Sequence, residues 1–378
     1  MASCILYQND DSDITLLDIP RSIESAQGDL TKRIISSSPL EHPYPSVEPK
    51  SAKAKARLGV VSIEDLLLQK YVQLALNGLK ERYKGEWCLP RVIGNPEIFA
   101  QGKKRKRKEM LSDEKCENDP ESDKLKPGYL GSDFMQNNVY SSLFCNRNAS
   151  SICTPTSSGL CARIPPHSTV LYGDITTTLE TFTQSAPQFK VIILDPPWPN
   201  RSARRKSSYS ISYSTTEVNT LLSSIPLDDH LAEDGLVAVW VTNKVGFRDI
   251  LLQEGGLFDE WGIELVEEWV WLKVTVNGAT ICAIDSMWRK PYEILLVGRK
   301  KGSEGTGNGD VKRRVVVAVP DLHSRKPNLK ALFKDMMGTE KYEALEIFAR
   351  NLTAGWWAWG NEVLKFQTEE HWIDEPNL

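Results

Sequence analysis

An unbroken apolar run that ends in two prolines is the feature that most constrains this chain. Val191–Leu194 contains four apolar residues without polar alternation, as in a parallel strand that is covered on both faces. Proline has no N–H group to donate to a sheet, so the strand must end by Pro196. In an open α/β sheet, ligands bind beyond the carboxyl ends of the strands. The run therefore predicts that Asp195 and the residues up to Trp198 lie at a binding edge.

Strand-like and helix-like segments alternate over residues 166–378, which we predict to be one domain. The alternation predicts an α/β fold with a sheet of about eight strands and helices on both faces. The expected strands are Thr169–Gly173, Val191–Leu194, Gly235–Thr242, Leu265–Val274, Tyr292–Gly298, Arg314–Val319, Ala344–Ala349 and Gly355–Gly360. Expected helices begin near Ser214, Val245, Pro327 and Asn361.

The first 165 residues are predicted to form two further parts. Residues 1–57 are rich in Ser, Pro and Asp, and we expect irregular structure there. Residues 58–165 are expected to form a helical module with a flexible linker. Its helix covers Val61–Tyr83, where Ser62 and Asp65 have the spacing of a capping box.

The linker contains a basic run and then an acidic segment. Lys103–Lys108 has six consecutive basic residues, a composition found in exposed loops, in nuclear import signals and in polyphosphate contacts. Import is the reading we favour, so we expect a nuclear protein, with the cytosol as the alternative. The segment Leu111–Lys126 is acidic and polar, which is typical of flexible chain.

Composition excludes several functional classes. The net charge of -4 argues against a globally basic surface for nucleic acid but leaves local basic patches open. The seven cysteines show no CxxC pairing, which indicates neither a disulfide framework nor a zinc site. The chain does not begin like a secretory signal, and no stretch is long and apolar enough to span a bilayer. We therefore expect neither a metal nor a membrane partner.

The residues that end the apolar run suit the recognition of a planar base. Asp195 and the main-chain carbonyl of Pro196 can accept hydrogen bonds from an exocyclic amino group, and both prolines stiffen the turn. Trp198 can stack on the base, an interaction worth about 1–3 kcal/mol. A base that is reached in this way must be unpaired or flipped out of its stack.

Basic side chains follow directly and are exposed loop residues or phosphate contacts. They are Arg201, Arg204, Arg205 and Lys206. We expect them to bind nucleic acid.

Asp-Pro-Pro-Trp after an apolar strand resembles the motif of amino-methyltransferases that modify the exocyclic nitrogen of adenine with S-adenosylmethionine. From Ser168 to the C-terminus the chain resembles the eukaryotic mRNA-adenosine methyltransferase family, and most of all its methyltransferase-like-four branch. The resemblance implies a Rossmann-like methyltransferase sheet and S-adenosylmethionine as cofactor. It also implies a set of catalytic residues, namely Asp195, Pro196, Pro197 and Trp198.

The same resemblance implies binding residues. Those for the cofactor are Asp174, Ile175, Asp195, Lys290, Glu346, Phe348, Arg350, Asn361 and Glu362. Another placement of a gap exchanges Lys290 for Tyr292. Tyr213 is implied to line the substrate pocket with Trp198, and His323–Pro327 resembles a family loop that leads into a helix. The family often has Pro-His-Asn where this chain has Asn351-Leu352-Thr353.

Each of these residues also has a simpler interpretation. Asp174 has the residue type of a turn and Asn361 that of a helix N-cap, while Lys290, Glu346 and Arg350 are compatible with a solvated surface. Their order along the chain is what favours binding.

The resemblance implies methyl transfer to N6 of adenine in RNA by a single chain. Within the branch, the implied substrate is 2′-O-methyladenosine in U2 small nuclear RNA. Adenine in DNA is the alternative inside the same enzyme class. A non-catalytic nucleic-acid-binding adaptor with a methyltransferase fold is the alternative from another class, and the intact Asp195–Trp198 motif argues against it.

Overall fold

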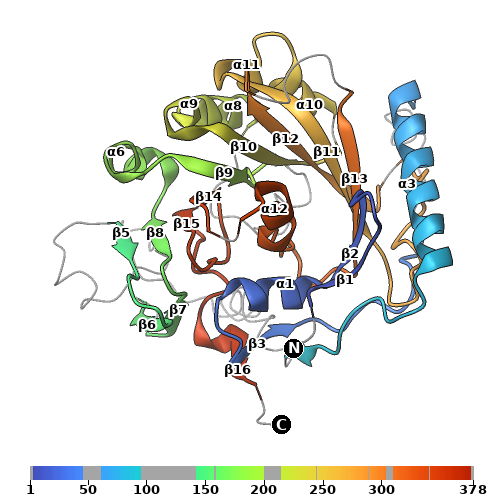
Figure 1. Cartoon of the computed structure of the whole chain (residues 1–378), viewed down its shortest axis with the longest axis horizontal. Helices are drawn as coiled ribbons and strands as arrows, with labels where there is room; N and C mark the ends of the chain where they lie inside the picture. The colour runs from blue at the N-terminus through green and yellow to red at the C-terminus, as the bar shows by residue number, and fades with distance from the viewer. Residues whose placement is uncertain are drawn as a thin grey trace, which may run out of the picture.

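The computed structural model describes residues 3–45, 61–94, 142–156, 159–199, 214–243, 245–287, 289–303, 310–339 and 341–375. Within these residues, eleven strands form one mixed sheet (Figure 1). Their spatial order is β1 (Ile5–Gln8), β2 (Ile14–Leu17), β13 (Lys312–Ala318), β11 (Ile263–Lys273), β12 (Tyr292–Lys300), β10 (Leu231–Val241), β9 (Phe189–Leu194), β14 (Ala344–Ile347), β15 (Trp357–Gly360), β8 (Thr169–Tyr172) and β5 (Leu143–Cys145).

Helices cover both faces of this sheet (Figure 1). On one face lie α6 (Ile175–Ser185), α8 (Thr215–Ser223), α9 (Leu227–His230), α10 (Val245–Leu252) and α11 (Leu257–Glu260), and on the other lie α1 (Ile19–Ala26) and α12 (Lys330–Met337). Smaller sheets consist of β16 (Trp372–Asp374), β3 (Lys32–Ser36) and β4 (Val92–Ile93), and of β6 (Ile152–Pro155) and β7 (Cys161–Ile164). The predicted α/β fold with helices on both faces is confirmed.

The central strand β9 shows why the sheet needs two cores. Ile192 and Leu194 belong to the core under α6, α8 and α10, whereas Val191 and Ile193 belong to the core under α1 and α12. All four side chains are almost inaccessible to solvent. Strand β9 pairs in parallel with both β10 and β14, so its carboxyl end faces the same way as theirs. This places Asp195 beside the residues that follow β14.

All eight strands expected from the sequence are present, and three further strands come from the N-terminal part. Strands β1 and β2 extend the sheet beyond β13, and β5 extends it beyond β8. The expectation of irregular structure in residues 1–57 is therefore wrong for the described residues 3–45. Leu16 and Leu17 are fully buried there because β2 pairs in parallel with β13. Where separate domains begin and end stays a prediction.

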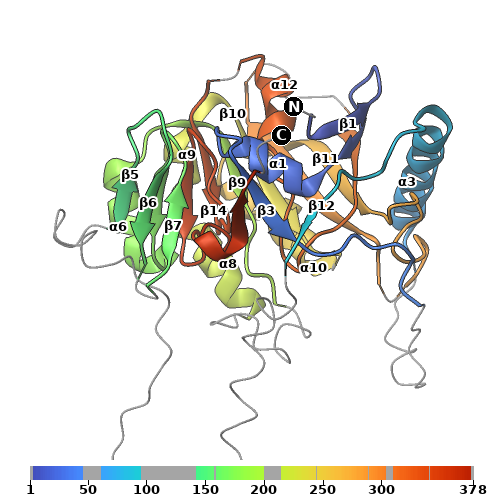
Figure 2. The ribbon, with the colours of Figure 1, turned by 90° about the horizontal axis from the view of Figure 1, so that it is seen from below.

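The predicted N-terminal helix is confirmed as α3 (Ile63–Arg82), with Ser62 as its N-cap. It contacts β13, and Figure 2 shows it at the end of the molecule that carries β1; one face packs through Val72, Leu76 and Leu79. The capping box at Ser214 is confirmed at the start of α8. Two helix predictions need correction: α12 begins at Lys330, after Pro327, and Asn361 starts a series of turns instead of a helix.

Within the part of the chain that the structure describes, no helix has both the length and the apolar composition needed to cross a membrane.

We predict that Leu16→Ala lowers the free energy of unfolding by about 2–5 kcal/mol, because it leaves a cavity where β2 meets β13. Urea denaturation measures the change. Leu74→Ala is the matched control, since Leu74 lies on the outer face of α3 with 56% of its surface exposed, and it should have little effect. Equal unfolding midpoints for the two variants would show that β2 is not part of the cooperative fold.

Candidate active site

The candidate site lies where β9, β14 and β15 end side by side. The Asp195 N–H group donates to the carbonyl of Ile347 at 3.3 Å, so the two strand ends are joined. The Phe348 N–H group donates to the carbonyl of Trp359 at 2.7 Å. Gly360 has φ +144°, and a Cβ atom there would lie 3.3 Å from Cα of Phe348, so glycine permits this close approach. The predicted residues around positions 195, 348 and 360 are thus brought together.

Asp195 lies between two cations. Nζ of Lys326 is 3.0 Å from Oδ1, and a guanidinium nitrogen of Arg350 is 3.3 Å from Oδ2. Only 14% of the Asp195 side chain is exposed, so water screens these contacts weakly. Each carboxylate oxygen therefore has one fixed cationic partner and keeps room for one further hydrogen bond.

These contacts belong to a continuous row of alternating charges, which we name the charge chain. Its members in order are Lys273, Glu293, Lys326, Asp195, Arg350, Glu362 and Lys365. The Lys326–Glu293, Arg350–Glu362 and Lys365–Glu362 distances are 2.8, 2.9 and 2.9 Å, and Lys273 contacts the other oxygen of Glu293. Neighbours in the charge chain hold one another in place, which pre-orients the carboxylate of Asp195.

The pKa values reflect this arrangement. Burial alone would raise the pKa of Glu293, but Lys326 and Lys273 together hold it well below its ordinary value. Burial alone would lower the pKa of Lys326, but Asp195 and Glu293 raise it above its ordinary value. Both groups are therefore charged at neutral pH.

Glu346 on β14 lies beside the charge chain but is not one of its members. Burial and, to a smaller degree, the nearby charge of Asp195 raise the pKa of this carboxyl to about 7, although Arg350 and Lys326 act in the opposite direction. Glu346 is half-buried beside the site and does not stand free in solvent.

The Asp174 side chain caps α6. One of its oxygens accepts from the N–H group of Thr176 at 3.0 Å and from its hydroxyl at 2.7 Å. The Gly173 N–H group donates to the carbonyl of Gly360 at 3.2 Å, so Asp174 lies near Asn361 at the end of β15. Asp174, for which the simpler interpretation was a turn residue, is thus the N-cap of α6, and Ile175, which is 3% exposed, packs in the core. Contact of either residue with a cofactor stays a prediction.

Trp198 differs from its expected arrangement. Its indole N–H group donates to the carbonyl of Trp240 at 2.6 Å, and its ring stacks on Phe247 with a centroid distance of 4.8 Å. Only 7% of Trp198 is exposed, which leaves little ring surface for a base. The main-chain N–H group of Trp198 also donates to the carbonyl of Pro196 at 2.7 Å. In the structure this indole therefore anchors the turn that holds Asp195.

The lysine that contacts Asp195 is Lys326, which the resemblance did not name as a binding residue. Contact of Lys290 with the cofactor stays a prediction. Tyr292, the alternative to Lys290, is 2% exposed and packs in the core. The resemblance of His323–Pro327 to a family loop was the available signal for Lys326. Tyr213, Arg201, Arg204, Arg205 and Lys206 lie outside the described residues, as does the basic run at 103–108.

The chemistry of the donor set indicates which kind of ligand the site fits. Lys326 and Arg350 offer hydrogen-bond donors to a carboxylate, and Asp195 and Glu362 offer acceptors to an ammonium group or to hydroxyls. A group that carries both a carboxylate and an ammonium, as an amino acid does, matches this arrangement.

Comparison with known proteins agrees with this geometry. The sequence matches the MT-A70 family over residues 189–362, a span that contains Asp195, Lys326, Arg350 and Glu362. It is 39% identical over 386 residues to the N6-methyladenosine RNA methyltransferase MTA1 of Cryphonectria parasitica, covering 99% of this chain and 95% of that protein. The chain belongs to the MT-A70 family.

Other relatives of this MT-A70 protein cover different shares of the chain. It is 38% identical to MTA1 of Pyricularia oryzae, over 99% of this chain and 97% of that protein. It is 36% identical to the N(6)-adenine-specific methyltransferase METTL4 of Mus musculus, over 56% of this chain and 45% of that protein. The resemblance seen in the sequence is therefore confirmed at the level of the family.

We predict that Glu346→Gln stabilises this MT-A70 protein at pH 8 but not at pH 4. The folded pKa lies above the ordinary value, so the ionised carboxyl costs stability as pH rises from about 4.5 through 7. The full shift corresponds to about 3 kcal/mol, and the glutamine variant avoids this cost. Urea denaturation at both pH values measures it. A pH-independent difference from the wild type would contradict the burial of this carboxyl as a charged group.

Proposed function

We propose that this chain is an S-adenosylmethionine-dependent methyltransferase that transfers a methyl group to N6 of adenine in RNA. The observation that carries the proposal is the carboxylate of Asp195, fixed at the end of β9 between Lys326 and Arg350. Membership of the MT-A70 family and the names of the MTA1 and METTL4 relatives support an N6-adenine methyltransferase.

Residues of the charge chain would hold the amino-acid end of the cofactor. Lys326 and Arg350 suit its carboxylate, and Asp195 suits its ammonium group. Asp174, Asn361 and Glu362 supply acceptors for ribose hydroxyls at the ends of β8 and β15. When bound, S-adenosylmethionine supplies the methyl group that is bonded to its positively charged sulfonium.

The acceptor side depends on the turn after β9. The free hydrogen-bonding capacity of the Asp195 carboxylate and of the Pro196 carbonyl can accept the two N–H groups of an adenine amino group. Such contacts draw the nitrogen away from conjugation with the ring and orient its lone pair. Because no strong acid or base is required, positioning supplies most of the rate enhancement.

The finer features of the proposal are the preferred substrate, the location of the protein in the cell and its activity as a single chain. We propose 2′-O-methyladenosine in U2 small nuclear RNA as the preferred substrate, which rests on the likeness to METTL4. A relative from Caenorhabditis elegans that is 33% identical over 210 residues is named a DNA N6-methyl methyltransferase, and this favours DNA as the alternative substrate. Nuclear localisation rests on the basic run at 103–108. The protein is also proposed to be active as a single chain.

We predict that Asp195→Asn lowers methyl transfer about 100-fold or more, because the variant loses the charged acceptor while keeping its shape. Mass spectrometry of nucleosides after incubation with S-adenosylmethionine measures N6-methyladenosine. Asp234→Asn is the matched control, since Asp234 is a carboxylate at the surface of β10 that pairs with Lys190. The proposal fails if the Asp195 variant keeps full activity, or if the wild-type protein methylates neither RNA nor DNA.

Matched oligomers separate the substrates. We predict turnover in the order U2-type RNA with 2′-O-methyladenosine, then the same RNA without the 2′-O-methyl group, then DNA of the same sequence. All three are assayed under single-turnover conditions at one salt concentration, since salt alters every affinity for nucleic acid. Preference for the DNA oligomer would favour the DNA alternative, and RNA binding without turnover would favour the adaptor.

We predict that replacing Arg201, Arg204, Arg205 and Lys206 together by Gln weakens RNA binding and flattens its salt dependence. Each lost phosphate contact on a single strand lowers the slope of log K against log salt by about 0.7. Fluorescence anisotropy over a salt series measures this slope. Lys300→Gln with Lys301→Gln is the control for lost charge, because these lysines lie at the edge of the sheet opposite to the Asp195–Trp198 motif. An unchanged slope in the fourfold variant would rule out phosphate contacts by this segment.

A further inference from the structure

The segment that carries Lys326 connects β13 to α12. We name residues 320–329 the Lys326 loop. Its Asp321 has a fully buried side chain, although it lies outside the charge chain. A buried carboxylate needs several partners, because an unpaired buried charge is costly. The partners of Asp321 therefore show what fixes the loop.

Most partners of Asp321 come from the N-terminal part of the chain. One carboxylate oxygen accepts from the N–H group of Ser37 at 2.8 Å and from its hydroxyl at 3.2 Å. The guanidinium of Arg91 lies 3.8 Å from the same oxygen. The other oxygen accepts from Arg325 of the loop itself at 2.6 Å. Ser37 and Arg91 both precede residues 189–362, the span that matches the family.

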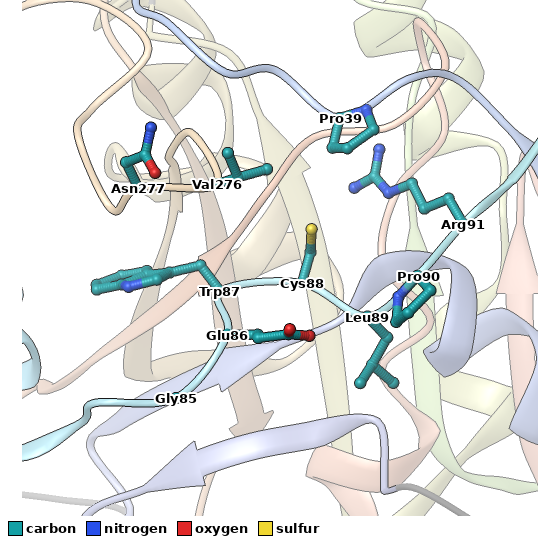
Figure 3. Close-up of a pocket in the computed structure, with 10 residues that line it drawn as sticks. All are labelled: Pro39, Gly85, Glu86, Trp87, Cys88, Leu89, Pro90, Arg91, Val276 and Asn277. Carbon is teal, nitrogen blue, oxygen red and sulfur yellow. The ribbon is translucent and has the colours of Figure 1, made fainter.

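Arg91 also holds the backbone where β13 runs into the loop. Its guanidinium donates to the carbonyl of Val319 at 2.8 Å and to that of Pro320 at 2.9 Å. Its side chain is only 1% exposed. Figure 3 shows Arg91 in the wall of a cavity of about 540 Å³, next to Pro39 and Cys88.

Arg325 transmits this restraint to its neighbour. Its side chain is fully buried, donates to the carbonyl of Ile35 at 2.9 Å and lies over the ring of Phe366 at 4.5 Å. Ser324, on the other side of Arg325, has the positive φ of +67° and presents its carbonyl to Arg350 at 3.1 Å. Such a backbone conformation costs energy and persists only where its surroundings fix it. Lys326 therefore leaves the loop in one direction, towards Asp195.

We infer that Arg91 and Asp321 are positioning residues, through which the N-terminal part of the chain fixes Lys326 against Asp195. The inference rests on the proposed function and gives Ile35, Ser37 and Arg91 a part in shaping the active site. Without Asp321, Arg325 loses its buried counter-ion and moves towards water, and Lys326 moves with it. Without Arg91, the carbonyls of Val319 and Pro320 lose these two hydrogen bonds, and the start of the loop shifts.

Chemical labelling of lysines tests the position of Lys326 without any assay of activity. We expect Asp321→Asn and Arg91→Gln to raise the rate of reductive dimethylation at Lys326, measured by mass spectrometry on the full chain. Lys190 is the internal reference, because it pairs with Asp234 and lies outside the charge chain. Both variants should also bind S-adenosylhomocysteine about tenfold more weakly in calorimetry, the factor expected for one lost charged hydrogen bond.

Arg163→Gln is the matched control. Arg163 binds Asp29 at 2.7 Å and the hydroxyl of Ser151 at 3.1 Å, so it also joins N-terminal segments, but both contacts lie away from Arg91 and the Lys326 loop. The control should lower the unfolding midpoint while leaving the labelling of Lys326 and the affinity unchanged. Arg91→Lys keeps the charge but cannot bond both carbonyls, so it should restore the fold and only part of the affinity.

The inference is overturned if folded Asp321→Asn and Arg91→Gln proteins label Lys326 at the wild-type rate, or if Arg163→Gln changes the labelling equally. Should Asp321→Asn and Arg91→Gln fail to fold, Arg91→Lys decides by the same labelling ratio. A wild-type protein that binds no S-adenosylhomocysteine would refute the proposed cofactor, whereas the labelling of Lys326 would still decide whether the N-terminal part positions this lysine.

Discussion

The interaction on which the site depends is the carboxylate of Asp195 held between an ammonium and a guanidinium. Each partner comes from a different part of the C-terminal half, Lys326 from the loop before α12 and Arg350 from the end of β14. The opposite charges of Glu293 and Glu362 then keep these two cations in place. Strand β9 sets the position of the carboxylate, and the buried indole of Trp198 keeps the following turn from moving. A reaction that gains its speed from alignment needs this rigidity.

Much of this architecture could be predicted from the sequence because buried parallel strands carry a strong signal. Runs such as Val191–Leu194 are apolar on both faces, and all eight expected strands are present. The order of motif and binding residues along the chain also indicated which strand ends meet. Strands β1 and β2 were missed because they lie in a segment rich in Ser, Pro and Asp, and β2 is buried only through its pairing with β13.

Details of the site were harder to predict because they depend on packing between distant segments. A lysine near a strand start and a lysine in a loop look alike in sequence, so the contact of Lys326 with Asp195 was not predicted, and contact of Lys290 with the cofactor stays a prediction. An indole after two prolines can point outward or inward, and only the position of Phe247 on α10 decides that Trp198 points inward. Likewise, nothing in the local sequence of Arg91 indicates that it bonds to the backbone beyond β13.

The pairing of β2 with β13 has a consequence for how the chain is made. Thr15 is synthesised about 300 residues before its partner Val316. The edge of the sheet beside β13 therefore cannot close until Val316 has left the ribosome, and contacts of such wide separation slow folding. The apolar side chains of Leu16 and Leu17 must wait while the intervening residues are synthesised, so nascent chains of this protein should depend on chaperones at that stage.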